Sequence, residues 1–196
     1  MYNIRLRTRM IFLAVTLAAL CPAILSAAEK ASQTATSLVN LVKPHEREAQ
    51  AIRFMLVVAP MGFPEGLADC MVAKTTPAIK DYFAALYAAH LSETELRQAV
   101  DFFKGEDGRA AVAFRLQHEQ NLLNASAKGE QITNEHPEYP LQIRKALEAF
   151  SATPAGRHFV GDELEARQPF ASEISELRNA GMAQCLADLS VGVGNR

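Results

Sequence analysis

The sequence predicts an all-α protein, a single-domain bundle of about seven to nine helices. Apolar residues recur at helical spacing in several segments, as they do at Leu96, Ala99, Val100 and Phe103. Strand signals are missing, because the chain has neither alternating apolar and polar runs nor Asn-Gly turns. About 170 residues follow an expected export signal, which is enough for one domain with a core of its own.

Residues 1–28 have the pattern of a Sec-type signal peptide. Three arginines precede an apolar run, residues 10–20, that is too short to span a bilayer. Small residues at 26–28 suit cleavage before Glu29. We prefer this interpretation to lipidation of Cys21, because the residue before that cysteine is bulkier than a lipidation signal favours. The expected location is therefore the periplasm or the cell exterior.

The net charge of the mature chain limits the classes of partner that it is expected to bind. Removing residues 1–28, which carry three arginines and no acid, changes the formal net charge from −2 to −5. A mildly acidic surface argues against nucleic acid, whose phosphates need a basic face. After signal cleavage no apolar run is long enough to predict a transmembrane segment.

Two cysteines, Cys70 and Cys185, remain after cleavage. An even count in an exported protein favours a disulfide between them, and two buried thiols are the alternative. In the chain-entropy model, closing a loop of about 100 residues stabilises the fold by several kcal/mol.

Two N-terminal helices are expected within residues 29–64. Residues 29–42 form the first, and Pro44 begins the second. The run 54–61 is apolar nearly all round, so it is a core element or a partner surface, and core is the preferred interpretation. A cluster of prolines and glycines at 60–66 then breaks the chain. The expected buried residues of the second helix are Ile52, Met55, Leu56 and Val58.

Residues 65–190 carry the expected helical core. A helix over 66–75 should end at Thr76-Pro77, where the chain restarts into a helix over 79–90. Further along, the polar stretch 128–140 predicts a surface loop. The last part of the chain is a helical region from Thr153 that Pro169 interrupts or kinks, followed by a flexible tail over 191–196.

A capped helix and a tight turn lie at the centre of this core. Ser92 and Glu95 form a capping box that starts a helix at Glu93. Lys104-Gly105 should end it, because glycine tolerates the left-handed conformation of a C-cap. The acids Glu106-Asp107 suit the positive end of the next helix.

This helix-turn-helix unit has a degenerate echo later in the chain. Phe102 stands six residues before Gly108, Phe150 stands six before Gly156, and an arginine follows each glycine. Thr153 supplies an N-cap in the second turn. The helical faces align at an offset of 47 residues and the Gly-Arg pairs at 48, so the two units differ by one residue.

The order of an apolar helix, a Phe-aromatic pair, a small turn, a glycine and a basic residue resembles the domain of unknown function 2059 family. The resemblance extends over residues 71–117 and implies a small, exported, helical protein, with no agreed catalytic residues to transfer. The family usually has Ser-Pro in the turn, where this chain has Gly105-Glu106, and Thr153-Pro154 in the echo is closer to it. The matching stretches are Met71–Pro77, Tyr87–His90, Leu91–Leu96 and Phe102–Gly108.

The sequence contains no strong motif for catalysis or metal binding. None of the five histidines lies in a metal-ligand spacing, and His90 suits the end of a helix, where the dipole favours an imidazolium. Nucleophile motifs, phosphate loops and a Cys-x-x-Cys pair are missing. We therefore expect no catalytic residue, metal or cofactor.

The sharpest hypothesis for a site concerns Gly108-Arg109 and Gly156-Arg157. Each pair stands near an expected helix start, where free N–H groups and a guanidinium could hold an anion. The alternative, which we prefer, is structural: the glycines allow close helix packing, and each arginine pairs with an acid or caps the preceding helix.

These observations favour an exported, non-enzymatic protein that binds a protein partner or a small apolar ligand between its helices. One alternative is an envelope hydrolase whose site is assembled from scattered Glu, His and Arg. Another is a structural protein that associates with itself as a homo-oligomer. A pocket with perturbed carboxylates would favour the hydrolase, and an exposed apolar patch would favour association.

Overall fold

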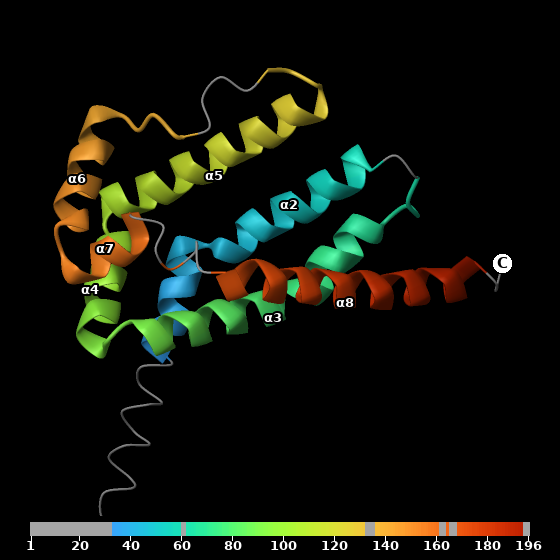
Figure 1. Ribbon diagram of the computed structural model, residues 1–196, viewed down its shortest axis with the longest axis horizontal. Helices are drawn as coiled ribbons and strands as arrows, with labels where there is room; N and C mark the ends of the chain where they lie inside the picture. Colours follow the sequence, from blue (N-terminus) through green and yellow to red (C-terminus); the bar gives the residue numbers. More distant parts are fainter. Residues whose placement is uncertain (1–32, 60–61, 132–135, 161–163, 165–167, 194–196) are drawn as a thin grey trace, which may run out of the picture.

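A computed structural model describes residues 33–59, 62–131, 136–160, 164 and 168–193 (Figure 1). Over these ranges the chain is an all-helical single-domain bundle without a strand, which confirms the predicted fold class. The expected signal peptide lies outside the described residues. The elements are a helical segment over residues 33–42, α2 (Pro44–Val58), α3 (Leu67–His90), α4 (Glu93–Lys104), α5 (Glu106–Ala127), α6 (Leu141–Ser151), α7 (Pro154–Val160) and α8 (Gln168–Val193).

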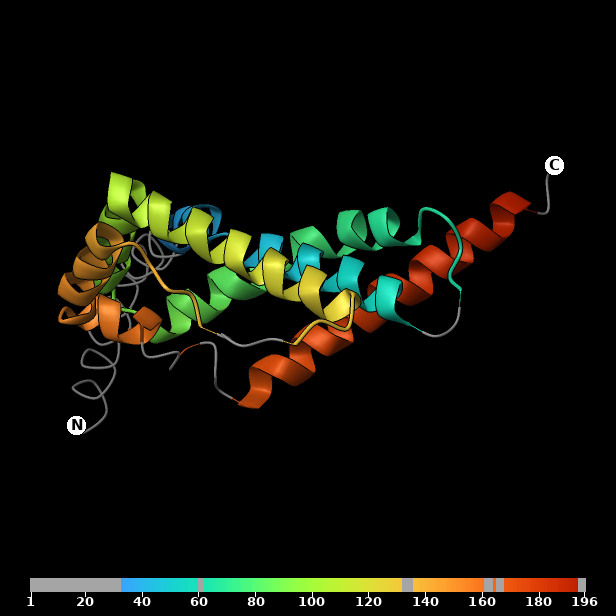
Figure 2. The same cartoon turned by 90° about the horizontal axis from the view of Figure 1, so that it is seen from above.

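The bundle is elongated. Helices α2, α3, α5 and α8 run along its length, and α4, α6 and α7 gather at one end (Figures 1 and 2). Helix α3 packs against both α2 and α8, and α2 also packs against α5. Seen from above, the C-terminal end of α8 extends beyond the rest of the body (Figure 2). Within the described ranges, no helix combines the length and the apolar composition that crossing a membrane requires.

The hydrophobic core has two parts. We call the first the aromatic end, where the C-terminal half of α3 meets α4, α6 and α7 around Phe83, Tyr87, Phe103 and Phe150. The helical segment 33–42 buries its apolar face in this same cluster, so the N-terminal helices and the core stretch 65–190 share one interior. We call the second the disulfide end, where α2, the start of α3 and α8 enclose Ile52, Leu67, Met71 and Cys185.

Several predicted boundaries are confirmed. Pro44 begins α2, and the capping box at Ser92 is complete, with the Glu95 N–H donating to Ser92 Oγ and the Ser92 N–H donating to the Glu95 carboxylate. Glu106 and Asp107 lie in the first turn of α5 as expected. Helix α6 carries Phe150, the aromatic residue of the second unit.

The predicted break at Thr76-Pro77 is wrong, because α3 is one helix of 24 residues with Pro77 inside it. Proline removes one backbone donor from the helix. The two threonines before it turn their hydroxyls back onto carbonyls: Thr75 Oγ1 donates to Met71 O at 2.8 Å, and Thr76 Oγ1 donates to Val72 O at 2.6 Å. Packing of α3 along both α2 and α8 then holds the helix through the proline.

Three further expectations need correction. Gly105 is not left-handed: its φ of −65° and ψ of 167° make it an extended junction that ends α4 and caps α5. Pro169 does not interrupt a helix, because it lies in the first turn of α8, separate from α7. Residues 191–193, expected in the flexible tail, still belong to α8, and residues 194–196 lie outside the described ranges.

Candidate functional site: the Gly-Arg turns and the groove at the disulfide end

The first Gly-Arg turn is a packing contact between α4 and α5. A Cβ added at Gly108 would lie 2.2 Å from the carbonyl oxygen of Phe102, so only a glycine allows this approach. Arg109 Nη1 donates to the carbonyl oxygen of Lys104 at 2.7 Å, which satisfies one of the free acceptors at the end of α4. Both residues therefore have the structural roles that the sequence offered as the alternative to anion binding.

The second turn repeats the glycine contact. A Cβ at Gly156 would lie 1.8 Å from the carbonyl oxygen of Phe150. Thr153 caps the new helix as predicted, since the Gly156 N–H donates to Thr153 Oγ1 at 3.0 Å. Helix α7 that follows has only seven residues. Gly156 thus occupies the same position relative to Phe150 as Gly108 does relative to Phe102.

The two turns are joined by their aromatic residues. The rings of Phe102 and Phe150 are stacked, with centroids 4.0 Å apart and an interplanar angle of 1°. Phe103 then contacts Phe150 edge-on at 5.5 Å. The internal echo is therefore a physical pairing at the aromatic end, and the offset of 48 residues is the one that aligns equivalent contacts. Anion binding by Arg109 and Arg157 stays a prediction.

A polar cluster beside these turns brings a serine, an acid and a histidine together. Glu95 Oε2 accepts from Ser92 Oγ at 2.7 Å, and Glu95 Oε1 lies 4.0 Å from His158 Nε2. The hydrogen bonds from Ser92 hold the pKa of Glu95 below its usual value, and the nearby charges of His158 and Arg157 lower it further. No local pattern in the sequence predicts this cluster, because His158 and Glu95 are far apart along the chain.

The order of these groups does not make a hydrolytic relay. In such a relay the imidazole lies between the hydroxyl and the acid, so that it can take the hydroxyl proton. Here the carboxylate of Glu95 lies in the middle, and Ser92 is engaged as the N-cap of α4. Among the described residues, no group of three His, Cys, Asp or Glu side chains could hold a metal ion.

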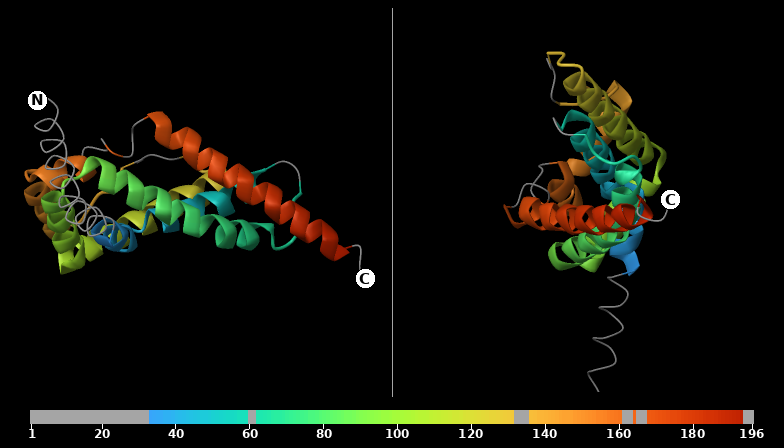
Figure 3. Two further views of the ribbon diagram at one scale, coloured as in Figure 1. Left: turned by 90° about the horizontal axis from the view of Figure 1, so that it is seen from below. Right: turned by 90° about the vertical axis from the view of Figure 1, so that its right-hand side faces the viewer.

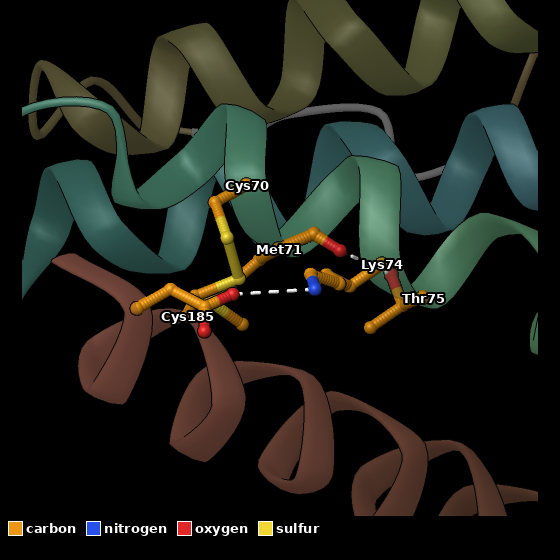
Figure 4. Close-up of a disulfide and its surroundings, with 6 residues drawn as sticks. Cys70, Met71, Lys74, Thr75 and Cys185 are labelled. Atoms are coloured by element: carbon orange, nitrogen blue, oxygen red, sulfur yellow. Dashed lines mark hydrogen bonds and ion pairs between the residues drawn. A yellow bond between two sulfur atoms is a disulfide. The ribbon is translucent and has the colours of Figure 1, made fainter.

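The disulfide end holds the expected covalent bridge. Cys70 in the first turns of α3 is bonded to Cys185 in α8, with their Cα atoms 5.8 Å apart (Figure 4). Lys74 Nζ reaches Asp188 Oδ2 at 3.2 Å beside the bridge. The disulfide therefore fastens the C-terminal helix to the start of α3, two helices that lie side by side in Figures 1 and 3.

An open groove lies at this end, between the last turns of α2 and the start of α3. Its volume is about 390 Å³. A left-handed Gly66, with φ of 80°, turns the chain from the groove into α3. At the rim Arg53 is paired with Asp69, Nη1 to Oδ1 at 2.5 Å. The groove is lined by Arg53, Leu56, Val57, Phe63, Pro64, Gly66, Leu67 and Ala68.

The apolar run that forms one side of this groove is not the core element that we preferred. Val57 is 73% exposed and Val58 is 46% exposed, whereas Ile52, one and a half turns earlier, is fully buried. Met55 and Leu56 are only partly buried against the disulfide-end cluster. The alternative of a partner surface therefore fits the position of these residues better.

Comparison with known proteins does not place the chain in a family. No family model matches the chain, and neither a curated protein nor a solved structure matches it.

Proposed function

We propose that the protein binds a small apolar ligand in the groove at the disulfide end and catalyses no reaction. The observation that carries this proposal is the exposure of Val57 on the wall of that groove. An aliphatic side chain in water forgoes about 1.5–3 kcal/mol of burial free energy, which an apolar ligand would recover. Concave sites lined mainly by apolar groups are the usual form of small-molecule sites.

The charged groups at the groove support a neutral ligand. Arg53 already has a partner in Asp69, and this acid also lies in the first turn of α3, where it complements the positive end of the helix. An added anion would have to compete with that carboxylate. The apolar residues that line the groove are therefore the groups that select the ligand.

We further propose that the protein is exported to the periplasm or the cell exterior. Residues 1–28 have the composition of a signal peptide, and the disulfide is typical of an oxidising compartment. The resemblance to the domain of unknown function 2059 family supports the same proposal. Intact-mass spectrometry of the protein from the envelope fraction tests it: the expected mass begins at Glu29, and a mass that retains residues 1–28 would contradict it.

The ligand proposal is tested with an uncharged fluorescent probe, N-phenyl-1-naphthylamine, on the oxidised protein. Val57→Asn places an amide on the groove wall, and the matched variant Val58→Asn places it on the next residue, which does not line the groove. We expect the first variant to weaken probe binding about tenfold and the second to change it less than about twofold. Equal binding by all three proteins would contradict the proposal.

Self-association is the second candidate, because Val58 is exposed outside the groove. Sedimentation velocity separates it from ligand binding. If the two valines form an interface between copies, the wild type should be a dimer at micromolar concentration and both variants should be monomers. A wild-type monomer at all concentrations would exclude this candidate.

A further inference from the structure

The two cysteines of the disulfide differ in their exposure. Cys70 is partly exposed, whereas Cys185 has no exposed area and belongs to an apolar cluster with Ile52, Leu67 and Met71. A reducing thiolate can therefore reach Cys185 Sγ only if the packing around it opens. Attack on Sγ of Cys70, the partly exposed cysteine, has a different obstacle, which is its leaving group.

The leaving group in that reaction is the Cys185 thiolate. A dithiol reductant attacks Cys70 Sγ, the S–S bond breaks, and the electron pair leaves with Cys185 Sγ, which then takes a proton from water. The second thiol of the reductant closes its own disulfide and releases Cys70 as a thiolate. Expelling a thiolate into apolar surroundings is unfavourable, because a buried charge without a partner is poorly solvated. Attack at Cys70, the partly exposed cysteine, must therefore expel the sulfur of a cysteine that has no exposed area.

Contacts between α3 and α8 surround the bridge on both sides. One turn before Cys185, Gly181 lies against Thr75, and a Cβ at Gly181 would be 2.4 Å from Thr75 Cγ2. Shortly after Cys185, the ion pair of Lys74 and Asp188 joins the same two helices (Figure 4). Water and thiols can reach Cys185 only when these contacts loosen.

We propose that the docking of α8 on α3 controls the redox state of the disulfide. With α8 docked, the bridge resists dithiols. When the C-terminal half of α8 loosens, Cys185 meets solvent, its thiolate becomes a competent leaving group, and reduction proceeds. The rate at which the folded protein is reduced therefore depends on how often α8 opens, and not only on the reactivity of the reducing thiol.

The test compares the rate of reduction by dithiothreitol in the folded protein with the rate in urea-unfolded protein under the same thiol concentration and pH. Gly181→Ala inserts a methyl between α3 and α8, and Gly62→Ala makes the same change where nothing lies within 4 Å. We expect the folded wild type to be reduced at least about tenfold more slowly than the unfolded chain. Gly181→Ala should accelerate reduction about tenfold, and Gly62→Ala less than about twofold.

The proposal fails on either of two results. One is a folded wild type reduced as fast as the unfolded chain, which would mean that the sulfurs are accessible with α8 docked. The other is an unchanged rate in a variant whose urea midpoint has fallen, which would mean that α8 does not gate the reaction. Where Gly181→Ala does not fold, Thr75→Ser replaces it, because it removes the methyl that contacts Gly181 and keeps the hydroxyl bonded to Met71.

Discussion

The two ends of this bundle are held together by different means. At the aromatic end, rings from α3, α4, α6 and α7 contact one another directly, with Phe103 touching both Phe150 and Phe159. At the disulfide end, a smaller cluster of Ile52, Leu67, Met71 and Cys185 is buried, and a covalent bond joins the helices. The comparison shows that one end is held by non-covalent contacts, while the other combines a covalent constraint with an apolar surface that is left open.

This difference has a physical reason. Aromatic rings bury a large area and fix their neighbours by geometry, so the helices that carry them need glycine where backbones meet. Methionine is flexible and fills irregular space, so it tolerates a neighbouring groove. The disulfide lowers the entropy of the unfolded chain without requiring a closed core around the bridge. An open binding surface is therefore easier to maintain at the disulfide end.

Removing the covalent constraint should have the largest effect. Replacing both Cys70 and Cys185 by alanine removes a link between positions 115 apart in the sequence. In the chain-entropy model the free energy of unfolding should fall by about 4 kcal/mol. Urea denaturation of the variant and the oxidised wild type measures the change. A loss below about 1 kcal/mol would show that the disulfide end is stable by packing alone and would remove the contrast with the aromatic end.

A methyl at the aromatic end should have the next largest effect. Gly156→Ala places a Cβ 1.8 Å from the carbonyl oxygen of Phe150, and Gly108→Ala places one 2.2 Å from that of Phe102. Backbone cannot move as a side chain can, so each change should cost about 1–3 kcal/mol in thermal or urea denaturation. Gly62→Ala, with free space around it, is the control. Equal stabilities for all three would mean that the two glycine contacts are not needed.

The sequence could predict the features that depend on residues close together along the chain. A capping box is set by residues three positions apart, so Ser92 and Glu95 were enough to place the start of α4. The repeated spacing of phenylalanine and glycine predicted two similar turns, and the structure adds that their rings stack on each other. The cysteine pair was predicted from its even count and the expected compartment, and the bond between Cys70 and Cys185 is present.

The sequence could not predict what depends on packing between distant segments. Pro77 is a breaker by local rules, and only the contacts of α3 with α2 and α8 keep the helix continuous there. The stretch that holds Val57 is apolar on all sides, so its periodicity does not say which side faces the core. The proximity of His158 to Glu95 arises from the contact of α7 with α4, for which no local signal exists.

The smallest effect is expected for the capping box of Ser92 and Glu95, which lies at the aromatic end. Its contribution to stability depends on the charge of Glu95. The folded state holds the pKa of Glu95 below its usual value, mainly through hydrogen bonds from Ser92. A carboxyl with a depressed pKa stabilises the fold above its unfolded-state pKa, near pH 4.5, and this contribution is lost as the pH falls through the folded-state pKa. Glu95→Gln has no such titration, so its stability should depend less on pH below about pH 4.5 than that of the wild type.

Urea denaturation at pH 6 and pH 3 checks this prediction, with Glu106→Gln as a control at the start of α5, where the N-cap makes no side-chain hydrogen bond. Ser92→Ala should lower the stability at pH 6 by about 1 kcal/mol. It should flatten the pH dependence only in part, because it removes the hydrogen bond from Ser92 Oγ to the Glu95 carboxylate and keeps the one from the backbone N–H of residue 92. An identical pH dependence in the wild type and Glu95→Gln would show that this carboxylate contributes nothing. In that case the aromatic end would depend on the packing of its rings and glycines without help from charge.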